Sequence, residues 1–260
     1  MAEDPPTPAP RWNWEDPAEF ARRRASADAE HSRCDQLDRV TTALPLTRTT
    51  LRELGVDGVE FGTRRARHRK GVAADLVTLH AGDIRTEPRH LYRVDGDLLF
   101  VELDIAEALP FDTDSVDWVH AEHLIEHVSL TTAIAWLAEV KRIIAPGGVV
   151  RLTTPDLRRY VDAYLGDGAF FAEHRERVHA VMHGADPMPD RPAFMVNQIF
   201  YLYGHRWIYD ADELRHALGE AGFDPSQVRV QTFADGHRPD VATLDRAWRN
   251  DETIYVEASV

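Results

Sequence analysis

One block of the chain, residues 115–156, constrains the fold more than any other. It reads SVDWVHAEHLIEHVSLTTAIAWLAEVKRIIAPGGVVRLTTPD, an apolar strand pattern followed by a helix pattern and a second strand pattern. Ser129 is a suitable N-cap for the helix, while Pro146 and the glycines after it end the helix and turn the chain. A strand–helix–strand unit of this kind is typical of a parallel α/β sheet.

The same alternation continues on both sides of this block. The further predicted strands are 56–63, 71–79, 97–105, 228–233 and 252–259, and a further helix is predicted at 210–223. The run at 97–105 is almost continuously apolar, as expected of a strand buried on both faces. The last two strands have no helix pattern between them, which favours a terminal antiparallel hairpin. The fold class is therefore α/β with a mostly parallel sheet.

Composition places these elements in one large domain. The chain has 260 residues, of which 43% are hydrophobic, enough for one sizeable core. We expect residues 1–10, which are rich in proline, to form a disordered tail, and residues 11–54 to form an N-terminal helical lid or cap. Residues 55–260 then form the α/β domain, with an insertion near 157–205 acting as a lid.

Charge and cysteine content exclude several classes of function. The formal net charge is -14, and an acidic surface repels a nucleic-acid backbone. Cys34 is the only cysteine, so neither an intrachain disulfide nor a cysteine-based zinc site can form. No apolar run has the length of a membrane span, and the N-terminus lacks the pattern of a signal peptide. We expect a cytoplasmic protein with a small-molecule substrate and no nucleic-acid or membrane partner.

The stretch HAEHLIEH, residues 120–127, contains the H-x-x-E-H arrangement of one class of zinc peptidase. On a helix, His123 and His127 would share a face, as two zinc ligands need. No third ligand is signalled, however, and the surrounding strand and helix patterns already account for the region. We therefore expect a strand that ends near His123, a helical turn at Glu126 and His127, and no metal site.

In open α/β sheets, ligands bind beyond the carboxyl ends of the strands. Here the residues at those ends, together with the stretch ELDIAEALPFDTDSVDWVHAEHLIEHV and the later LAEVKRIIAPGGVVRLTTPDL, resemble the class I S-adenosylmethionine-dependent methyltransferases, in particular the methyltransferase-11-like members. The segment GHRWIYDADELRHALGEAGF is also similar to this family. The resemblance covers about residues 55–260. It implies a seven-stranded Rossmann-like sheet and S-adenosylmethionine as the cofactor.

The resemblance also implies which residues bind the cofactor. Asp75 would accept hydrogen bonds from the ribose hydroxyls, Asp104 would meet the adenine amino group, and the backbone of Ile105 would pair with the ring. Glu122 and His123 would lie near the methionine part or the substrate. The full set of expected cofactor-binding residues is Glu60, Gly62, Asp75, Asp104, Ile105, Glu122 and His123.

The first loop departs from the family pattern, which is glycine-rich. Here it reads EFGTRRARHRKG: Gly62 remains, but the next glycine is Gly71, and the residues between them are mostly basic. The loop at 64–70 could bind the cofactor carboxylate, an anionic substrate or only solvent, and all three interpretations stay open.

Catalytic and substrate-binding candidates come from two stretches. An imidazole titrates near neutral pH, which makes His127 a candidate general base. The aromatic stretch NQIFYLYGHRWIYD, residues 197–210, could pack in the core or cover the site, and aromatic faces attract a sulfonium cation. We select His127 and Tyr209 as catalytic residues, and Asn197, Tyr203, His205 and Trp207 as substrate-binding residues.

Four functions follow, in decreasing order of preference. The first is methyl transfer from S-adenosylmethionine to a small molecule. The second uses the same cofactor for cyclisation or a lyase reaction of its aminobutyl arm, which gives methylthioadenosine. The third is a binding protein that keeps the fold without the chemistry, and the fourth is an H-x-x-E-H zinc hydrolase.

Overall fold

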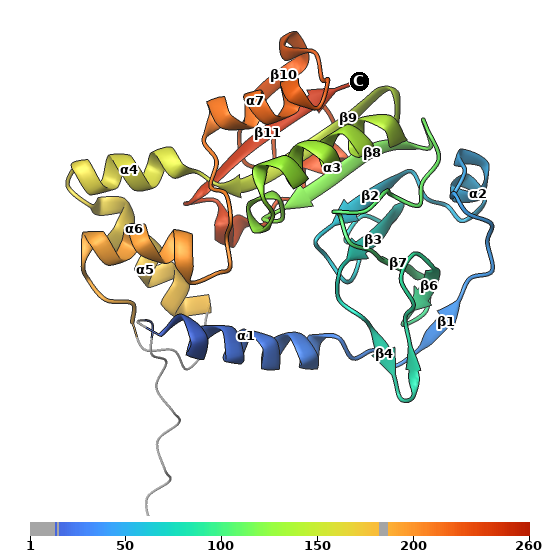
Figure 1. The fold of residues 1–260 in the computed structure, drawn as a ribbon, viewed down its shortest axis with the longest axis horizontal. Helices are drawn as coiled ribbons and strands as arrows, with labels where there is room; N and C mark the ends of the chain where they lie inside the picture. Colours follow the sequence, from blue (N-terminus) through green and yellow to red (C-terminus); the bar gives the residue numbers. More distant parts are fainter. Residues whose placement is uncertain (1–13, 15, 182–186) are drawn as a thin grey trace, which may run out of the picture.

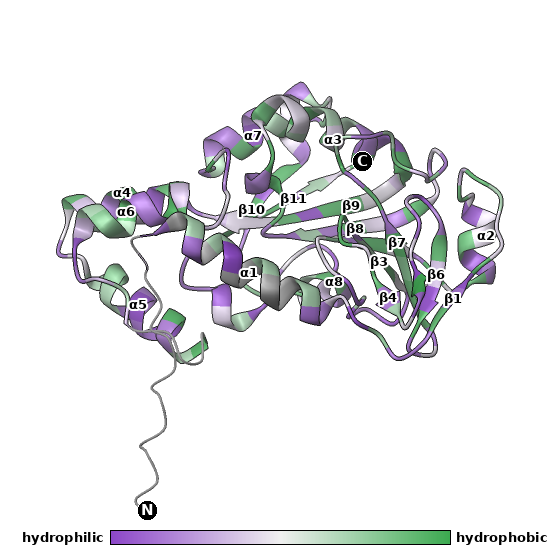
Figure 2. Cartoon of the chain, turned by 60° about the horizontal axis from the view of Figure 1, so that its bottom comes forward, coloured by the Kyte–Doolittle hydropathy of each residue, from purple (hydrophilic) through white to green (hydrophobic). Residues whose placement is uncertain are grey.

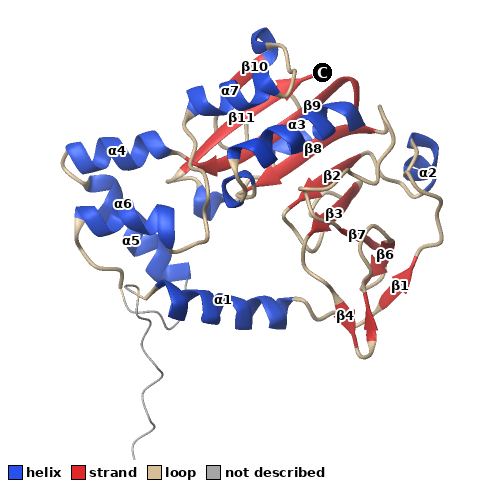
Figure 3. Ribbon diagram, in the orientation of Figure 1, coloured by secondary structure: helices blue, strands red, loops and turns tan. Residues whose placement is uncertain are grey.

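The computed structural model describes residues 14, 16–181 and 187–260 of the chain, and the proline-rich residues 1–10 lie outside this range. It has a central sheet with helices on one face and at one end (Figures 1 and 3). The strands are β1 Leu37–Arg39, β2 Gly58–Phe61, β3 Gly71–Asp75, β4 His80–Ala81, β5 Ile84–Arg85, β6 Leu91–Val94, β7 Leu98–Glu102, β8 Val116–Glu122, β9 Ile144–Pro155, β10 Val228–Gln231 and β11 Thr253–Ser259. The α-helices are α1 Pro17–His31, α2 Arg48–Glu53, α3 Leu130–Ile143, α4 Leu157–Leu165, α5 Ala169–Val181, α6 Pro192–Tyr201, α7 Ala211–Glu220 and α8 Pro239–Ala242.

The sheet confirms the predicted α/β class. The strand order in the sheet is β1-β6-β7-β3-β2-β8-β9-β11-β10, and the five adjacent strands from β7 to β9 run parallel to one another. Seven of these strands form the predicted mostly parallel sheet, with β10 and β11 as its antiparallel end. Two more strands, β6 and β1, extend the opposite edge, so the sheet of the described residues has nine strands. β1 comes from residues 11–54, for which only helices were predicted.

One face of the sheet is apolar and packs against α3 and α7, which lie side by side in Figure 1. Alternate residues of β8, Val119 and Ala121, point into this core. Ser129 caps α3 as predicted, because its side chain accepts a hydrogen bond from the Thr132 amide. Asp210 caps α7 in the same way. In Figure 2 the central strands are largely hydrophobic, as a buried sheet requires.

The other face of the sheet carries buried charges. A row of four side chains crosses neighbouring strands at one level: Glu60 of β2, His120 of β8, Arg151 of β9 and Glu257 of β11. Short connections leave this face without a long helix, since β2 and β3 are joined by a nine-residue loop, residues 62–70. Instead, residues 232–252 between β10 and β11 fold over it, and we call them the cover segment.

A second apolar cluster lies at the carboxyl end of the sheet. It is formed by α4, α5 and α6, which follow β9 and correspond to the predicted lid insertion (Figure 1). Tyr160 and Met195 are fully buried in it, and Trp14 from the N-terminal part of the chain packs there too. Within the described residues, we find no helix with the length and apolar character needed to cross a bilayer.

Candidate active site

A cavity of about 930 Å³ opens at the carboxyl ends of β2, β3 and β8. This is the edge where ligands bind in open α/β sheets, and the volume is that of a small-molecule site. Residues from α5, the cover segment and the stretch after α6 form its other walls. The expected site residues that line it are Gly62, Asp75, Glu122, His123, His127, Tyr203 and His205.

At one end of the cavity, three residues fit the nucleoside part of S-adenosylmethionine. Gly62 has a φ of 72°, a conformation that favours glycine, and its main chain borders the cavity. The Asp75 carboxyl group lies at the end of β3, where it can accept hydrogen bonds from a ribose. Leu76 follows it and is 67% exposed, a large apolar side chain that a flat ring can cover. The site therefore fits the cofactor.

The middle of the cavity is formed by the end of β8. The Glu122 carboxylate accepts a hydrogen bond from the Arg246 amide at 2.8 Å and lies 3.3 Å from Nη1 of Arg67, so it ties the cover segment to the 62–70 loop. His123 has a φ of 51°, which is strained for a residue with a side chain. Its Nε2 is 2.9 Å from Oγ1 of Thr253, and burial lowers the pKa of His123 well below its ordinary value. His123 is therefore neutral near pH 7.

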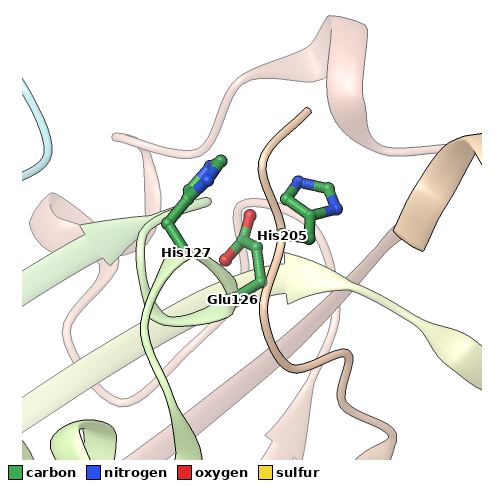
Figure 4. Close-up of side chains that lie close together, drawn as sticks. All are labelled: Glu126, His127 and His205. Atoms are coloured by element: carbon green, nitrogen blue, oxygen red, sulfur yellow. The ribbon is translucent and has the colours of Figure 1, made fainter. Parts of the chain in front are cut away.

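Glu126, His127 and His205 form a cluster at the other end. Figure 4 shows the Glu126 carboxyl group between the two imidazoles, whose ring centroids are 4.8 Å apart. The backbone carbonyl of Glu126 accepts hydrogen bonds from the amides of Arg206 and Trp207, which brings His205 over the turn. Burial raises the pKa of Glu126 to about 7, against a hydrogen bond from Thr154 that lowers it.

The same cluster has the composition of a metal site. Glu126, His127 and His205 each offer one ligand atom, and these atoms lie within 4.8 Å of one another. The zinc-peptidase geometry does not form, because residues 125–127 make only one 3-10 turn and His123 lies outside it with a positive φ. Nδ1 of His205 is 2.5 Å from the Ile199 carbonyl, so that nitrogen carries the proton and Nε2 is the basic one. The absence of a metal stays a prediction.

The structure places six expected site residues outside the cavity. Glu60 faces the cover-segment side of the sheet and accepts hydrogen bonds from the amides of Arg67 and His68, so it shapes the 62–70 loop. Asp104 is exposed and accepts from the Ala106 amide, and Ile105 packs against the main core.

The other three belong to the aromatic stretch. Tyr209 is fully buried, and among the described residues its hydroxyl has no hydrogen-bond partner. Asn197 bonds to the Ala193 carbonyl on the exposed side of α6, and the Trp207 indole bonds to Glu213. Helical spacing explains why Asn197 points away from the cavity, because Met195 and Ile199 occupy the side of α6 that packs in the second apolar cluster.

Several cavity residues were not anticipated from the sequence. They are His31, His174, Arg177, Arg246, Trp248, Arg249 and Glu252. Four of them belong to the end of the cover segment, in the stretch RAWRNDE. The sequence does carry one sign of the cover segment: the connection between the last two strands is too long for a hairpin loop.

Comparison with known proteins identifies the family. A family model described as a methyltransferase domain matches residues 49–228, more than half of the chain. Similar solved structures include a SAM-dependent methyltransferase from Archaeoglobus fulgidus, with 12% identity over 82% of this chain and 92% of that chain, at a TM-score of 0.43. Another, from Mesorhizobium loti, has 17% identity over 82% and 96%, at a TM-score of 0.41. A search of curated proteins gave no match. The chain belongs to the class I S-adenosylmethionine-dependent methyltransferase family, whose cofactor is S-adenosylmethionine.

Proposed function

We propose that this protein transfers the methyl group of S-adenosylmethionine to a small-molecule acceptor bound in the same cavity. When bound, the cofactor supplies an electrophilic methyl group on a positively charged sulfur. One observation carries the proposal: a single cavity of about 930 Å³ is lined at one end by Gly62 and Asp75 and at the other by His127 and His205. Candidate cofactor contacts and candidate bases therefore face a shared space.

The histidine cluster supports a role in removing a proton from the acceptor. His127 lines the cavity, and a neutral imidazole can accept a proton from a hydroxyl or amine as its bond to carbon forms. Glu126 lies beside it with a pKa of about 7, so its carboxyl group can hold or release a proton near neutral pH. The acceptor must also be held in line at about 3 Å, and such positioning supplies much of the rate in methyl transfer.

A second function is favoured by one specific feature, the 62–70 loop. This loop joins two parallel strands in nine residues without a helix, and it contributes Thr63, Arg64 and Arg65 to the cavity. The amino acid end of the cofactor would therefore meet arginines in place of a glycine-rich turn. The amine of a folded aminobutyl arm could then attack the carbon by which the arm is bonded to sulfur, so that a ring closes while the carbon–sulfur bond breaks and methylthioadenosine leaves with the bonding electron pair.

Product analysis separates the two reactions. The purified chain is incubated with S-adenosylmethionine, alone and with a panel of small-molecule acceptors, and products are followed by mass spectrometry. Methyl transfer predicts S-adenosylhomocysteine that accumulates only when an acceptor is present, at a rate that His127→Asn lowers. Methylthioadenosine formed without any acceptor would refute methyl transfer and support cyclisation or a lyase reaction.

A further inference from the structure

Arginine side chains reach the cavity from three separate parts of the chain. They are Arg64 and Arg65 of the 62–70 loop, Arg177 of α5, and Arg246 and Arg249 of the cover segment. The acidic residues that line the same cavity are Asp75, Glu122 and Glu252. The chain as a whole is acidic, so this local excess of arginine runs against its overall charge.

Three of these arginines have a carboxylate partner. The N···O distances are 2.5 Å for Arg65 with Asp95, 2.6 Å for Arg177 with Asp251, and 3.1 Å for Arg246 with Glu122. Each of these three guanidinium groups is neutralised by its carboxylate partner, so these side chains are poorly suited to bind a further anion.

Arg249 is different. Among the described residues, no carboxylate oxygen lies within 4.0 Å of its guanidinium nitrogens, and its buried Nε has no hydrogen-bond acceptor. Its guanidinium carbon lies 4.3 Å from the centre of the Trp248 ring, and that of Arg177 lies 5.8 Å from the same ring. Stacking on the indole orients Arg249 without using its N–H donors.

The surroundings of Arg249 show the effect of this charge. Burial lowers the pKa of His123 most, and the positive charge of Arg249 is the next largest cause, so that imidazole stays neutral. A buried donor without an acceptor also costs free energy, and a bound anion removes that cost. The planar guanidinium matches a carboxylate or a phosphate with two parallel hydrogen bonds.

We propose that Arg249 binds a carboxylate or phosphate group of the acceptor, so that the substrate of this enzyme is a small anion. The inference rests on the proposed function, because it names the class of acceptor that the cavity takes. Trp248 serves as the platform that holds the guanidinium toward the cavity.

The surroundings of Arg249 assign it to the acceptor and not to the cofactor carboxylate. Arg249 ends the 3-10 turn Ala247–Arg249 of the cover segment, outside the sheet, while Gly62 follows β2 and Asp75 ends β3. Its charge lowers the pKa of both His123 and Glu126, whose Nδ1 and Oε1 lie 3.4 Å apart. Arg249 is thus at the end of the cavity that holds His127 and His205, where an acceptor would meet its base.

Titration calorimetry with simple anions tests this. The full chain is saturated with S-adenosylhomocysteine and titrated with inorganic phosphate and, separately, with acetate. The wild-type chain is expected to bind at least one of them with a stoichiometry of one, and the stronger of the two identifies the group. Arg249→Gln should weaken that binding at least about tenfold, Arg249→Lys less so, and Arg215→Gln on the exposed side of α7 not at all.

The outcomes are distinct. Equal anion affinity in the wild-type and Arg249→Gln chains, or no binding of either ion to the wild type, would overturn the inference. A tenfold loss of S-adenosylhomocysteine affinity in Arg249→Gln would also overturn it, because Arg249 would then belong to the cofactor. Circular dichroism establishes that each variant is folded. If S-adenosylhomocysteine fails to bind the wild type, the proposed function is refuted. The phosphate and acetate titrations, repeated without S-adenosylhomocysteine, still test whether Arg249 binds an anion.

Discussion

Replacing Arg151 should destabilise the fold and loosen the cover segment. Arg151 lies in the middle of β9 and is fully buried, yet all five of its N–H donors have acceptors. Nε and Nη2 bind the two oxygens of Asp245 at 2.8 and 2.6 Å, and Nη1 binds Glu257 at 2.8 Å. The remaining donors reach the carbonyls of Asp235 and Thr232, both at 3.0 Å. One side chain thus fastens the cover segment to the sheet at several points.

The magnitude follows from what the substitution leaves behind. Arg151→Met has a similar length but leaves two buried carboxylates, Asp245 and Glu257, without their cation. Removing one partner of a buried ion pair costs about 3–5 kcal/mol, mainly because the other charge stays buried. The same carboxylates accept hydrogen bonds from the amides of Ala234 and His237, so the cover segment should open locally as well.

Urea unfolding measures the first effect and amide hydrogen exchange the second. We expect Arg151→Met to lower the free energy of unfolding by about 3–5 kcal/mol and to speed exchange at residues 232–252. Arg158→Met, which breaks an exposed ion pair with Asp162, is the matched control and should change the free energy of unfolding by less than about 1 kcal/mol. A loss below about 1 kcal/mol for Arg151→Met, with unchanged exchange, would show that other contacts hold the segment.

Three further predictions concern the cavity. Burial raises the pKa of Glu126 from 4.5 to about 7, so between these pH values the folded chain keeps a proton that the unfolded chain releases, and stability falls as the pH rises. Glu126→Gln should remove about 3 kcal/mol of that fall between pH 4.5 and 8. Parallel curves of stability against pH for the wild-type and variant chains would contradict this prediction. Gly62→Ala should lower the free energy of unfolding by about 1–2 kcal/mol because of its positive φ, whereas Gly219→Ala inside α7, where the added carbon meets nothing within 4 Å, should not; effects of the same sign and size would contradict this. Inductively coupled plasma mass spectrometry should find no stoichiometric metal, and one tightly held zinc that is lost in His205→Ala would reverse this expectation.

The apolar half of the fold could be predicted from the sequence. Local signals fix α3, which Ser129 caps and which ends before Pro146, and they fix the buried strand β7. The turn expected at Pro146 does not form as a separate element, because β9 already begins at Ile144 and Pro146 lies inside this strand. Local signals also fix the edge of the sheet where Gly62 and Asp75 line a cavity.

The charged half could not be predicted in the same way. Arg151 and Glu257 read as the outward-facing residues of ordinary strands, because a sequence pattern does not show that a distant segment will cover them. The cover segment itself has little periodicity, and it is held in place by the ion pair between Asp245 and Arg151, which are 94 positions apart in the chain. Arg249 reaches the cavity only through that segment, so its role becomes visible only in three dimensions.

Binding of S-adenosylhomocysteine to the cavity tests the central claim most directly. In titration calorimetry the wild-type chain should bind one equivalent, and Asp75→Asn should weaken binding by roughly 10- to 100-fold, because charge-assisted hydrogen bonds to the ribose contribute about 1.5–3 kcal/mol. Asp83→Asn, in the exposed turn between β4 and β5, should leave the affinity unchanged. No heat at millimolar ligand, or equal affinity in the wild-type and Asp75→Asn chains, would contradict a cofactor site at this edge of the sheet.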